Sequence, residues 1–304
     1  MRGASSNQAG MPAALLLLAP AVFVLIWSTG YVVAKVAAPY AEPLSFLVLR
    51  YCGVVLLMLV IALAVRAPWP ASRREVAHIA IAGVGIQAIY LGGVWVAVKH
   101  GMPAGVVALI VNLQPVLTAV AGPLIGERVT ARQWLGLALG FAGVVLVVSN
   151  KMSSVGMSLG VVLLAILALV AITAGTLHQK RYCPRFDLRT GQVIQFVASV
   201  TVTLPFALAY ESFHIEWNAA VVAAMLWSIV VLTGGGASLL LFMIKHGAAT
   251  QVTGYMYLVP AVTALLAWAM FGETLAGSAL AGMVVTIAGV ALVVRPARKP
   301  PPTE

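Results

Sequence analysis

The chain has 304 residues, of which 62% are hydrophobic and 9% charged, with a formal net charge of +10 and a mean hydropathy of +1.04. Soluble domains are about half apolar and about a quarter charged, so this composition excludes a soluble enzyme or binding module and indicates an integral membrane protein. The two cysteines, Cys52 and Cys183, provide no disulfide framework, metal motif or redox motif.

The sequence contains ten apolar stretches long enough to cross a hydrocarbon core, which takes about 20 residues of α-helix. Each stretch is apolar nearly all round rather than alternating, which favours helices over the strands of a β-barrel. The first stretch continues too far for a signal peptide, so we expect it to be a retained helix. The expected spans are residues 12–34, 44–65, 77–98, 104–125, 133–149, 158–178, 190–210, 220–243, 250–271 and 276–294.

Basic residues are distributed unevenly between the two sides of the expected bundle. Fourteen lie in the N-terminal segment, the even-numbered loops and the C-terminal segment, against four on the other side, which are Lys35, Arg50, Lys99 and Lys151. The positive-inside rule then places both termini in the cytoplasm. Because the basic residues are spread over separate loops, they indicate contact with anionic lipid headgroups and give no reason to expect nucleic acid.

The chain also repeats itself in a fixed register, which predicts two copies of one five-helix unit. We expect these copies at residues 12–150 and 151–295, within one membrane domain flanked by cytoplasmic segments at 1–11 and 296–304. Since five is odd, the second copy must cross the membrane in the opposite sense, and such inverted repeats are typical of secondary transporters. An offset of 145 or 146 residues aligns Gly30 with Gly175, Lys99-His100-Gly101 with Lys245-His246-Gly247, and Gly126-Glu127 with Gly272-Glu273, and sets Arg50 opposite Gln195.

Four stretches carry a resemblance to a known family: WSTGYVVAK, PAGVVALIVNLQPVLTAV, GERVTARQWLGLALGFAGVVLVV and its repeat GETLAGSALAGMVVTIAGVALVV. From about residue 12 to residue 295 the chain resembles the drug/metabolite transporter superfamily, in its ten-helix EamA-type branch. The resemblance implies a bacterial inner-membrane exporter of amino acids or other metabolites, with the aromatic amino acid exporters as the nearest likeness. Fold alone does not choose among amino acids, purines, drug-like cations and sugars, and a channel remains an alternative to a carrier.

Polar and aromatic side chains in the middle of apolar helices are the expected lining of a substrate cavity. Amides combined with aromatic rings suit a zwitterionic or amphipathic solute better than a charged one. Asn112 and Gln114 have an alternative role in hydrogen bonds between helices, and Trp95 an alternative place at the membrane interface. The candidate substrate-binding residues are Trp27, Tyr31, Gln87, Tyr90, Asn112, Gln114, Tyr255 and Tyr257, the last two lying about 200° apart on their helix.

Other residues are candidates for the moving parts of a carrier. Pro115 and Pro260 interrupt equivalent helices of the two copies and are expected hinges. Glu127 and Glu273 lie at equivalent helix ends on opposite membrane faces, where they either complement a helix dipole or act as gates. None of the eight acidic residues falls in mid-membrane, so the buried carboxylate of proton-coupled antiporters is missing and uniport or exchange is favoured.

An enzyme is not expected. The pentapeptide GMSLG at residues 156–160 matches G-x-S-x-G, but Ser158 begins a membrane helix and the only aspartate, Asp187, lies in a loop. The sequence has no H-E-x-x-H motif and no P-loop. We therefore expect a small-molecule carrier in a lipid membrane, with no catalytic residue, metal ligand or cofactor, and with monomer and homodimer both open.

Overall fold

The structure is a computed structural model that describes residues 13–121, 130–155, 158–183, 185–236, 239, 258–273 and 277–294. These residues are helical apart from their connections and one isolated antiparallel bridge between Ala41 and Ile215. The elements are α1 (Ala13–Ala37), α2 (Pro43–Ala64), α3 (Arg73–Gly83), the π-helical segment η1 (Val84–Ile89), α4 (Tyr90–Lys99), α5 (Ala104–Val111), α6 (Gln114–Val120), α7 (Ala131–Val155), α8 (Leu159–Tyr182), α9 (Leu188–Tyr210), α10 (Ala219–Leu226), the π-helical segment η3 (Trp227–Gly235), α13 (Val259–Phe271) and α14 (Gly277–Val294).

The apolar helices of the structure fall on the ten spans expected from the sequence. Five described helices are long and apolar enough to cross a membrane, and five shorter apolar helices occupy the remaining spans. The all-α membrane fold predicted from the apolar runs is therefore confirmed. The long helices cover Leu18–Ala37, Pro43–Ala64, Arg73–Lys99, Leu159–Tyr182 and Leu188–Tyr210, and the shorter ones Ala104–Thr118, Trp134–Leu146, Ala219–Gly235, Val259–Phe271 and Leu280–Leu292.

Several helices begin at a residue whose side chain caps the first turn. Ser72 accepts a hydrogen bond from the amide of Glu75, and Asn218 accepts one from the amide of Val221. Ser158, the serine of the hydrolase-like pentapeptide, accepts a hydrogen bond from the amide of Val161 at the start of α8. Its hydroxyl thus has a structural role at a helix N-terminus, as its position before an apolar run indicates.

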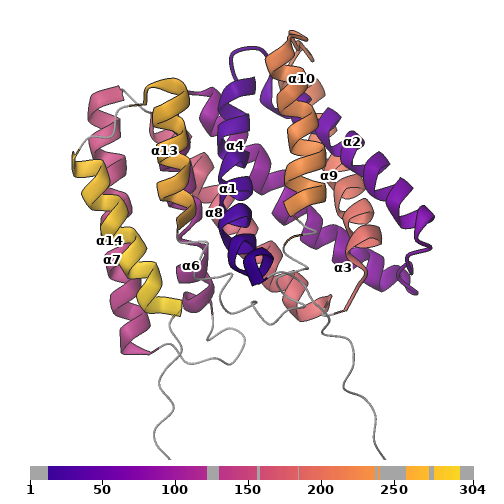
Figure 1. Ribbon diagram of the computed structural model, residues 1–304, viewed down its shortest axis with the longest axis horizontal. Coiled ribbons are helices and arrows are strands. Elements are labelled where there is room, and N and C mark those ends of the chain that lie inside the picture. The colour runs from indigo at the N-terminus through magenta and orange to yellow at the C-terminus, as the bar shows by residue number, and fades with distance from the viewer. Residues whose placement is uncertain are drawn as a thin grey trace, which may run out of the picture.

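Helices of the two halves of the chain pack against each other. In Figure 1, α7 and α14 lie together at one edge of the bundle and α2 and α9 at the other, and both pairs are in contact. Between these edges, α4 packs on α8, and α1 packs on α13. Each of these four pairs combines one helix from before residue 156 with one from after it, so a space between paired helices is lined from both halves.

The α7–α14 seam depends on glycine. A Cβ atom added to Gly143 would lie 2.5 Å from the carbonyl oxygen of Gly282, and one added to Gly289 would lie 2.6 Å from that of Gly136. These separations are shorter than any normal contact, so the two backbones touch where the side chains are absent. The glycines of the fifth and tenth spans therefore serve packing within one molecule.

A second set of contacts joins two connections at one end of the bundle. Glu42, before α2, accepts hydrogen bonds from the amides of Ser212 and His214, both at 2.9 Å. Glu211, after α9, accepts bonds in return from the amides of Leu44 and Ser45 at the N-terminus of α2. A carboxylate at a helix N-terminus is favoured by the dipole, so the α1–α2 and α9–α10 connections hold each other in place.

In the described part of the chain, two spans contain a π-helical segment, at positions that the repeat aligns with each other. An offset of 146 residues carries Gln87 in η1 onto Thr233 in η3. The wider turn of a π-helix displaces backbone carbonyls from their usual partners, and side chains take their place. The Tyr51 hydroxyl donates to the Gln87 carbonyl at 2.7 Å, and the Thr233 hydroxyl donates to the Ser228 carbonyl at 3.0 Å.

The fourth span is broken into two helices. α5 ends at Val111, with Asn112 and Leu113 in a turn, and α6 begins at Gln114 and Pro115. Proline lacks the amide that would continue the helix, and it is best tolerated in a first turn. Pro260 has the equivalent place in the first turn of α13. Both proposed hinges thus lie where a helix starts, and their part in movement stays a prediction.

Candidate functional site

A cavity of about 400 Å³ lies between helices of the two halves. The first half contributes residues of α1, α2, η1, α4 and α6, and the second half contributes residues of α8, α9 and η3. Its size falls in the range of small-molecule sites, roughly 300–1,000 Å³. The cavity is therefore the part of the described structure best suited to hold a solute within the bundle.

Aromatic rings form much of the cavity wall. Phe23 and Trp27 lie one helical turn apart on α1, with ring centroids 5.4 Å apart. The hydroxyl of Tyr31, one turn further, is 3.2 Å from the hydroxyl of Tyr90 on α4. Phe196 of α9 completes the set from the second half. Such a wall offers stacking surface and hydroxyl groups to a solute with an apolar part.

Polar side chains interrupt this wall at a few places. The Gln114 amide donates a hydrogen bond of 3.1 Å to the Thr176 hydroxyl, which joins α6 to α8. Gln87 of η1 and Gln192 of α9 also line the cavity. Arg50 of α2 lines it too, and its guanidinium lies 3.5 Å from the hydroxyl of Thr233. The cavity thus combines apolar rings with a small number of amides, hydroxyls and one cation.

A model of the EamA-like transporter family matches residues 11–149 of the chain and matches a second time at residues 159–295. The chain belongs to the EamA-like transporter family. The double match also confirms that the chain consists of two copies of one unit. It is thus a multi-pass membrane transporter, and the cavity lies between two related EamA units.

Relatives of similar length support this assignment. The chain is 28% identical over 288 residues to uncharacterized transporter YvbV of Bacillus subtilis (strain 168), covering 92% of this chain and 90% of that protein. It is 25% identical over 286 residues to uncharacterized inner membrane transporter YedA of Escherichia coli (strain K12), covering 92% and 91%. A probable amino-acid metabolite efflux pump of Salmonella typhimurium is 23% identical over 279 residues, covering 88% and 90%.

A solved crystal structure shares the fold of this EamA chain. It aligns with a TM-score of 0.62 at 18% sequence identity and covers 92% of this chain and 96% of the other. At this identity the likeness shows the arrangement of helices alone.

Most of the candidate substrate-binding residues of this EamA protein surround one cavity. Trp27, Tyr31, Gln87, Tyr90 and Gln114 all line it. The other three candidates do not join them in the described structure. The side-chain amide of Asn112 donates to the Ala108 carbonyl at 2.7 Å, so it bonds to the last turn of α5, which it follows. Tyr255 and Tyr257 lie outside the described residues. Contact of any of these residues with a substrate stays a prediction.

Arg50 corrects the expected distribution of basic residues. The positive-inside count groups it with the basic residues of the outer side, but it lies inside α2 and only 7% of it is exposed. A charged residue within the expected span 44–65 was the available signal, because ionisable groups at membrane depth usually face a cavity. Without Arg50 the basic residues divide fourteen to three, so the predicted orientation keeps its basis.

Several residues outside the candidate set also line the cavity. Trp95 is one of them, and it is buried with 4% exposed, although its position near a helix end also fits a place at the membrane interface. Gln192 and Phe196 also line the cavity, and they lie four residues apart on one face of α9. An amide and an aromatic ring at this spacing within an apolar span were the available signal. Thr173 donates to the Leu169 carbonyl of its own helix, whereas Thr176 faces the cavity, so two threonines three residues apart have different roles.

Of the two candidate gate residues, Glu273 is described and Glu127 lies outside the described residues. Glu273 follows α13 and forms an ion pair with Lys35 near the end of α1. The Lys35 ammonium also lies 5.5 Å from the centre of the Phe271 ring. The pair therefore joins a helix of the first EamA unit to one of the second.

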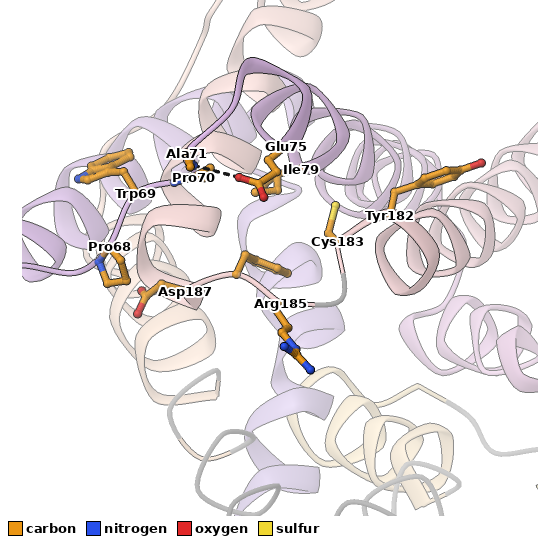
Figure 2. Close-up of a pocket in the computed structure, with 11 residues that line it drawn as sticks. Pro68, Trp69, Pro70, Ala71, Glu75, Ile79, Tyr182, Cys183, Arg185 and Asp187 are labelled. Atoms are coloured by element: carbon orange, nitrogen blue, oxygen red, sulfur yellow. Dashed lines mark hydrogen bonds between the residues drawn. The ribbon is translucent and has the colours of Figure 1, made fainter.

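A larger cavity of about 750 Å³ lies at the end of the bundle that holds the α2–α3 and α8–α9 connections, and Figure 2 shows its lining. Glu75 accepts a hydrogen bond from the Ala71 amide at 2.9 Å, drawn as a dashed line in Figure 2. Hydrogen bonds from Arg189 hold the pKa of Asp187 below its usual value, and burial raises the pKa of the Cys183 thiol. Since both carboxylates already have partners and connections form much of the wall, this cavity is a weaker candidate for the transported solute.

Proposed function

We propose that this EamA protein is a secondary carrier that exports small metabolites by alternating access, with amino acids, including aromatic ones, as the main substrates. The observation that supports this most is the cavity of about 400 Å³, to which both inverted units contribute aromatic rings and amides. Binding between two repeats lets one site face either side of the membrane in turn. The printed name of the Salmonella typhimurium relative, an amino-acid metabolite efflux pump, agrees with this proposal.

The proposed setting is the bacterial inner membrane with both termini in the cytoplasm. The uneven distribution of basic residues supports the orientation. The name of the YedA relative, an inner membrane transporter, agrees with the proposed membrane. In this orientation the Lys35–Glu273 pair and the Glu42–Glu211 contacts lie at the outer end of the bundle. The cavity of Figure 2 lies at the cytoplasmic end.

The proposed mechanism is uniport or exchange rather than proton antiport. Among the described residues, no carboxylate lines the cavity. Proton-coupled antiporters commonly alternate a buried carboxylate between proton and substrate, and the described lining of the cavity contains no such group.

Counterflow in proteoliposomes tests the proposed function. Vesicles preloaded with unlabelled amino acids are given labelled aromatic or small neutral amino acids outside, with and without a pH gradient. We expect saturable accumulation that requires the preloaded amino acid and does not respond to the gradient. If no amino acid accumulates, the proposed substrates are contradicted. Flux that does not saturate with concentration would indicate a channel. Strong dependence of accumulation on the pH gradient would contradict exchange without protons.

The Lys35–Glu273 pair is expected to stabilise closure at the outer end. Replacing either residue with alanine should lower the exchange rate by about two- to fivefold, because an ion pair that is still partly exposed contributes about 1 kcal/mol or less. The reversed pair Lys35→Glu with Glu273→Lys should restore most of the rate measured by counterflow. If the reversed pair is as impaired as the two single variants together, the residues do not act as a gate pair.

Pro115 and Pro260 are expected to let their helices bend during transport. Replacing either with alanine restores an amide that can extend the helix towards its N-terminus, so we expect slower exchange with little change in thermal stability. Pro205→Ala is the matched control, because Pro205 lies inside α9, is exposed and does not line the cavity. Unchanged exchange by Pro115→Ala and Pro260→Ala would contradict the hinge role.

A further inference from the structure

The cavity contains a buried cation without a described counter-ion. Arg50 is 7% exposed and lines the cavity between α2, η1, α9 and η3. Its only hydrogen bond among the described residues is the long contact of 3.5 Å from a terminal nitrogen to the Thr233 hydroxyl. Its Nε atom is buried and has no partner in the described part of the chain. The guanidinium therefore has unused donors in the wall of the cavity.

The acidic side chains of the described residues have partners other than Arg50. Six of the eight acidic residues lie in the described part, and every one of these six has partners other than Arg50. The other two, Glu127 and Glu304, belong to a predicted helix end and to the C-terminal segment. The six partnerships are Glu42 with Ser212 and His214, Glu75 with Ala71, Asp187 with Arg189, Glu211 with Leu44 and Ser45, Glu216 with His214, and Glu273 with Lys35.

A buried charge of this kind costs free energy unless another group compensates it. An isolated ion is expensive in an apolar surrounding, and within a membrane such residues mark the path of a solute. The guanidinium offers its donors in a planar fork that matches the two oxygens of a carboxylate. An anionic group that enters with the solute would supply the missing partner.

A buried acceptor lies in the same cavity. The side-chain oxygen of Gln192 has no hydrogen-bond donor among the described residues. Gln192 is on α9, which packs along α2, the helix of Arg50. An α-amino acid carries a carboxylate, which accepts hydrogen bonds, next to an ammonium group, which donates them. One such molecule could satisfy both unpaired groups.

The repeat supplies no second arginine at the position equivalent to Arg50. The residue opposite Arg50 in the second unit is Gln195, whose side-chain amide donates to the Gln179 side chain at 2.8 Å. That position is uncharged and already paired. The two units therefore differ in charge at this position, and a solute that pairs with Arg50 is bound in one orientation.

We propose that Arg50 is the substrate-anchoring residue of this carrier, that it binds a carboxylate group of the solute, and that the Gln192 oxygen accepts a hydrogen bond from the adjacent ammonium group. The inference rests on the proposed function and deepens it, since it specifies the class of substrate as carboxylates, with α-amino acids bound best. Amines without a carboxylate and uncharged solutes bind weakly. The aromatic wall receives the remaining part of the molecule.

Three probes that share one ring test this inference on the purified full-length protein. The probes are phenylalanine, 3-phenylpropionate, which lacks the amine, and phenethylamine, which lacks the carboxylate, and the measurement is ligand-induced thermal stabilisation at graded concentrations. We expect apparent affinity to decrease in that order, with phenethylamine at least about tenfold weaker than phenylalanine, because a hydrogen bond to a charged group contributes about 1.5–3 kcal/mol.

Variants assign the effect to the two residues. Arg50→Gln should remove the preference for carboxylates, and Arg50→Lys, which keeps the charge but loses the fork, should retain part of it. Gln192→Leu should lower the apparent affinity for phenylalanine and leave the apparent affinity for 3-phenylpropionate unchanged. Arg73→Gln, an exposed change at the start of α3, is the control for loss of one positive charge. Arg50→Lys keeps the test valid if Arg50→Gln does not fold.

The outcomes separate this inference from the proposed function. Stabilisation by carboxylates that depends on Arg50, without amino acid counterflow, would support the anchor and contradict amino acid export. Counterflow of amino acids with equal affinity in wild type and both Arg50 variants would support export and overturn the anchor. Equal binding of phenethylamine and phenylalanine, or no stabilisation by any carboxylate, would also overturn it.

Discussion

Replacing Gly289 with alanine is expected to destabilise the folded protein by about 1–3 kcal/mol or more, because the added methyl group has no space. Its Cβ would lie 2.5 Å from the amide nitrogen of Gly140 and 2.6 Å from the carbonyl oxygen of Gly136. Both obstructing atoms belong to the backbone of α7, so a side-chain rotation cannot relieve the overlap. The measurement is the thermal unfolding midpoint of the purified protein, which should fall by several degrees.

The same helix provides a matched control for this change. Gly277, also in α14, has no atom within 4 Å of where a Cβ would lie, so Gly277→Ala should leave the midpoint unchanged or raise it. Gly143→Ala, on the opposite side of the seam, should behave like Gly289→Ala. Equal midpoints for Gly289→Ala and Gly277→Ala would show that α7 and α14 do not approach each other this closely.

Replacing Thr176 with tryptophan is expected to reduce transport by more than about tenfold while the protein still folds. Thr176 lines the cavity with an exposed side chain, so an indole ring at this position would occupy space that a solute needs. It would also remove the hydroxyl that accepts the hydrogen bond from Gln114. Counterflow measures the loss of exchange, and the thermal midpoint shows that the loss does not arise from unfolding.

Two variants separate filling of the cavity from other effects of this change. Thr176→Ser keeps the hydroxyl and should retain most of the exchange. Thr201→Trp places the same ring at an exposed position of α9, where the native hydroxyl bonds only to the Val197 carbonyl of its own helix, and should also retain exchange. If Thr176→Trp and Thr201→Trp exchange substrate at similar rates, the cavity is not the space through which the solute passes.

The architecture could be predicted from the sequence because it depends on features that are local in the chain. The length of an apolar run fixes whether a helix can span the membrane, and this requires no knowledge of its neighbours. The repeat appears as matching motifs at a constant offset. Spacing alone placed Trp27 with Tyr31, and Gln87 with Tyr90, on common helix faces, and each pair lies at the cavity.

The remaining features depend on contacts between helices or on small changes within them. Asn112 and Gln114 are equally polar, but the break between α5 and α6 turns one towards its own backbone and the other towards the cavity. The π-helical segments have no pattern in the sequence, because they arise from a shift of backbone hydrogen bonds. The place of Arg50 in the cavity wall does not follow from the charge distribution, because a count by side of the membrane assigns every basic residue to a loop.

The central claim is that one cavity between the two EamA units faces each side of the membrane in turn. The most direct test places a single cysteine at position 176, with Cys52 and Cys183 replaced by serine, and measures its reaction with a charged, membrane-impermeant thiol reagent in right-side-out and inside-out vesicles. We predict reaction from both sides and protection by saturating amino acid substrate. Reaction from one side only under every condition, or no effect of substrate on either side, would contradict the claim.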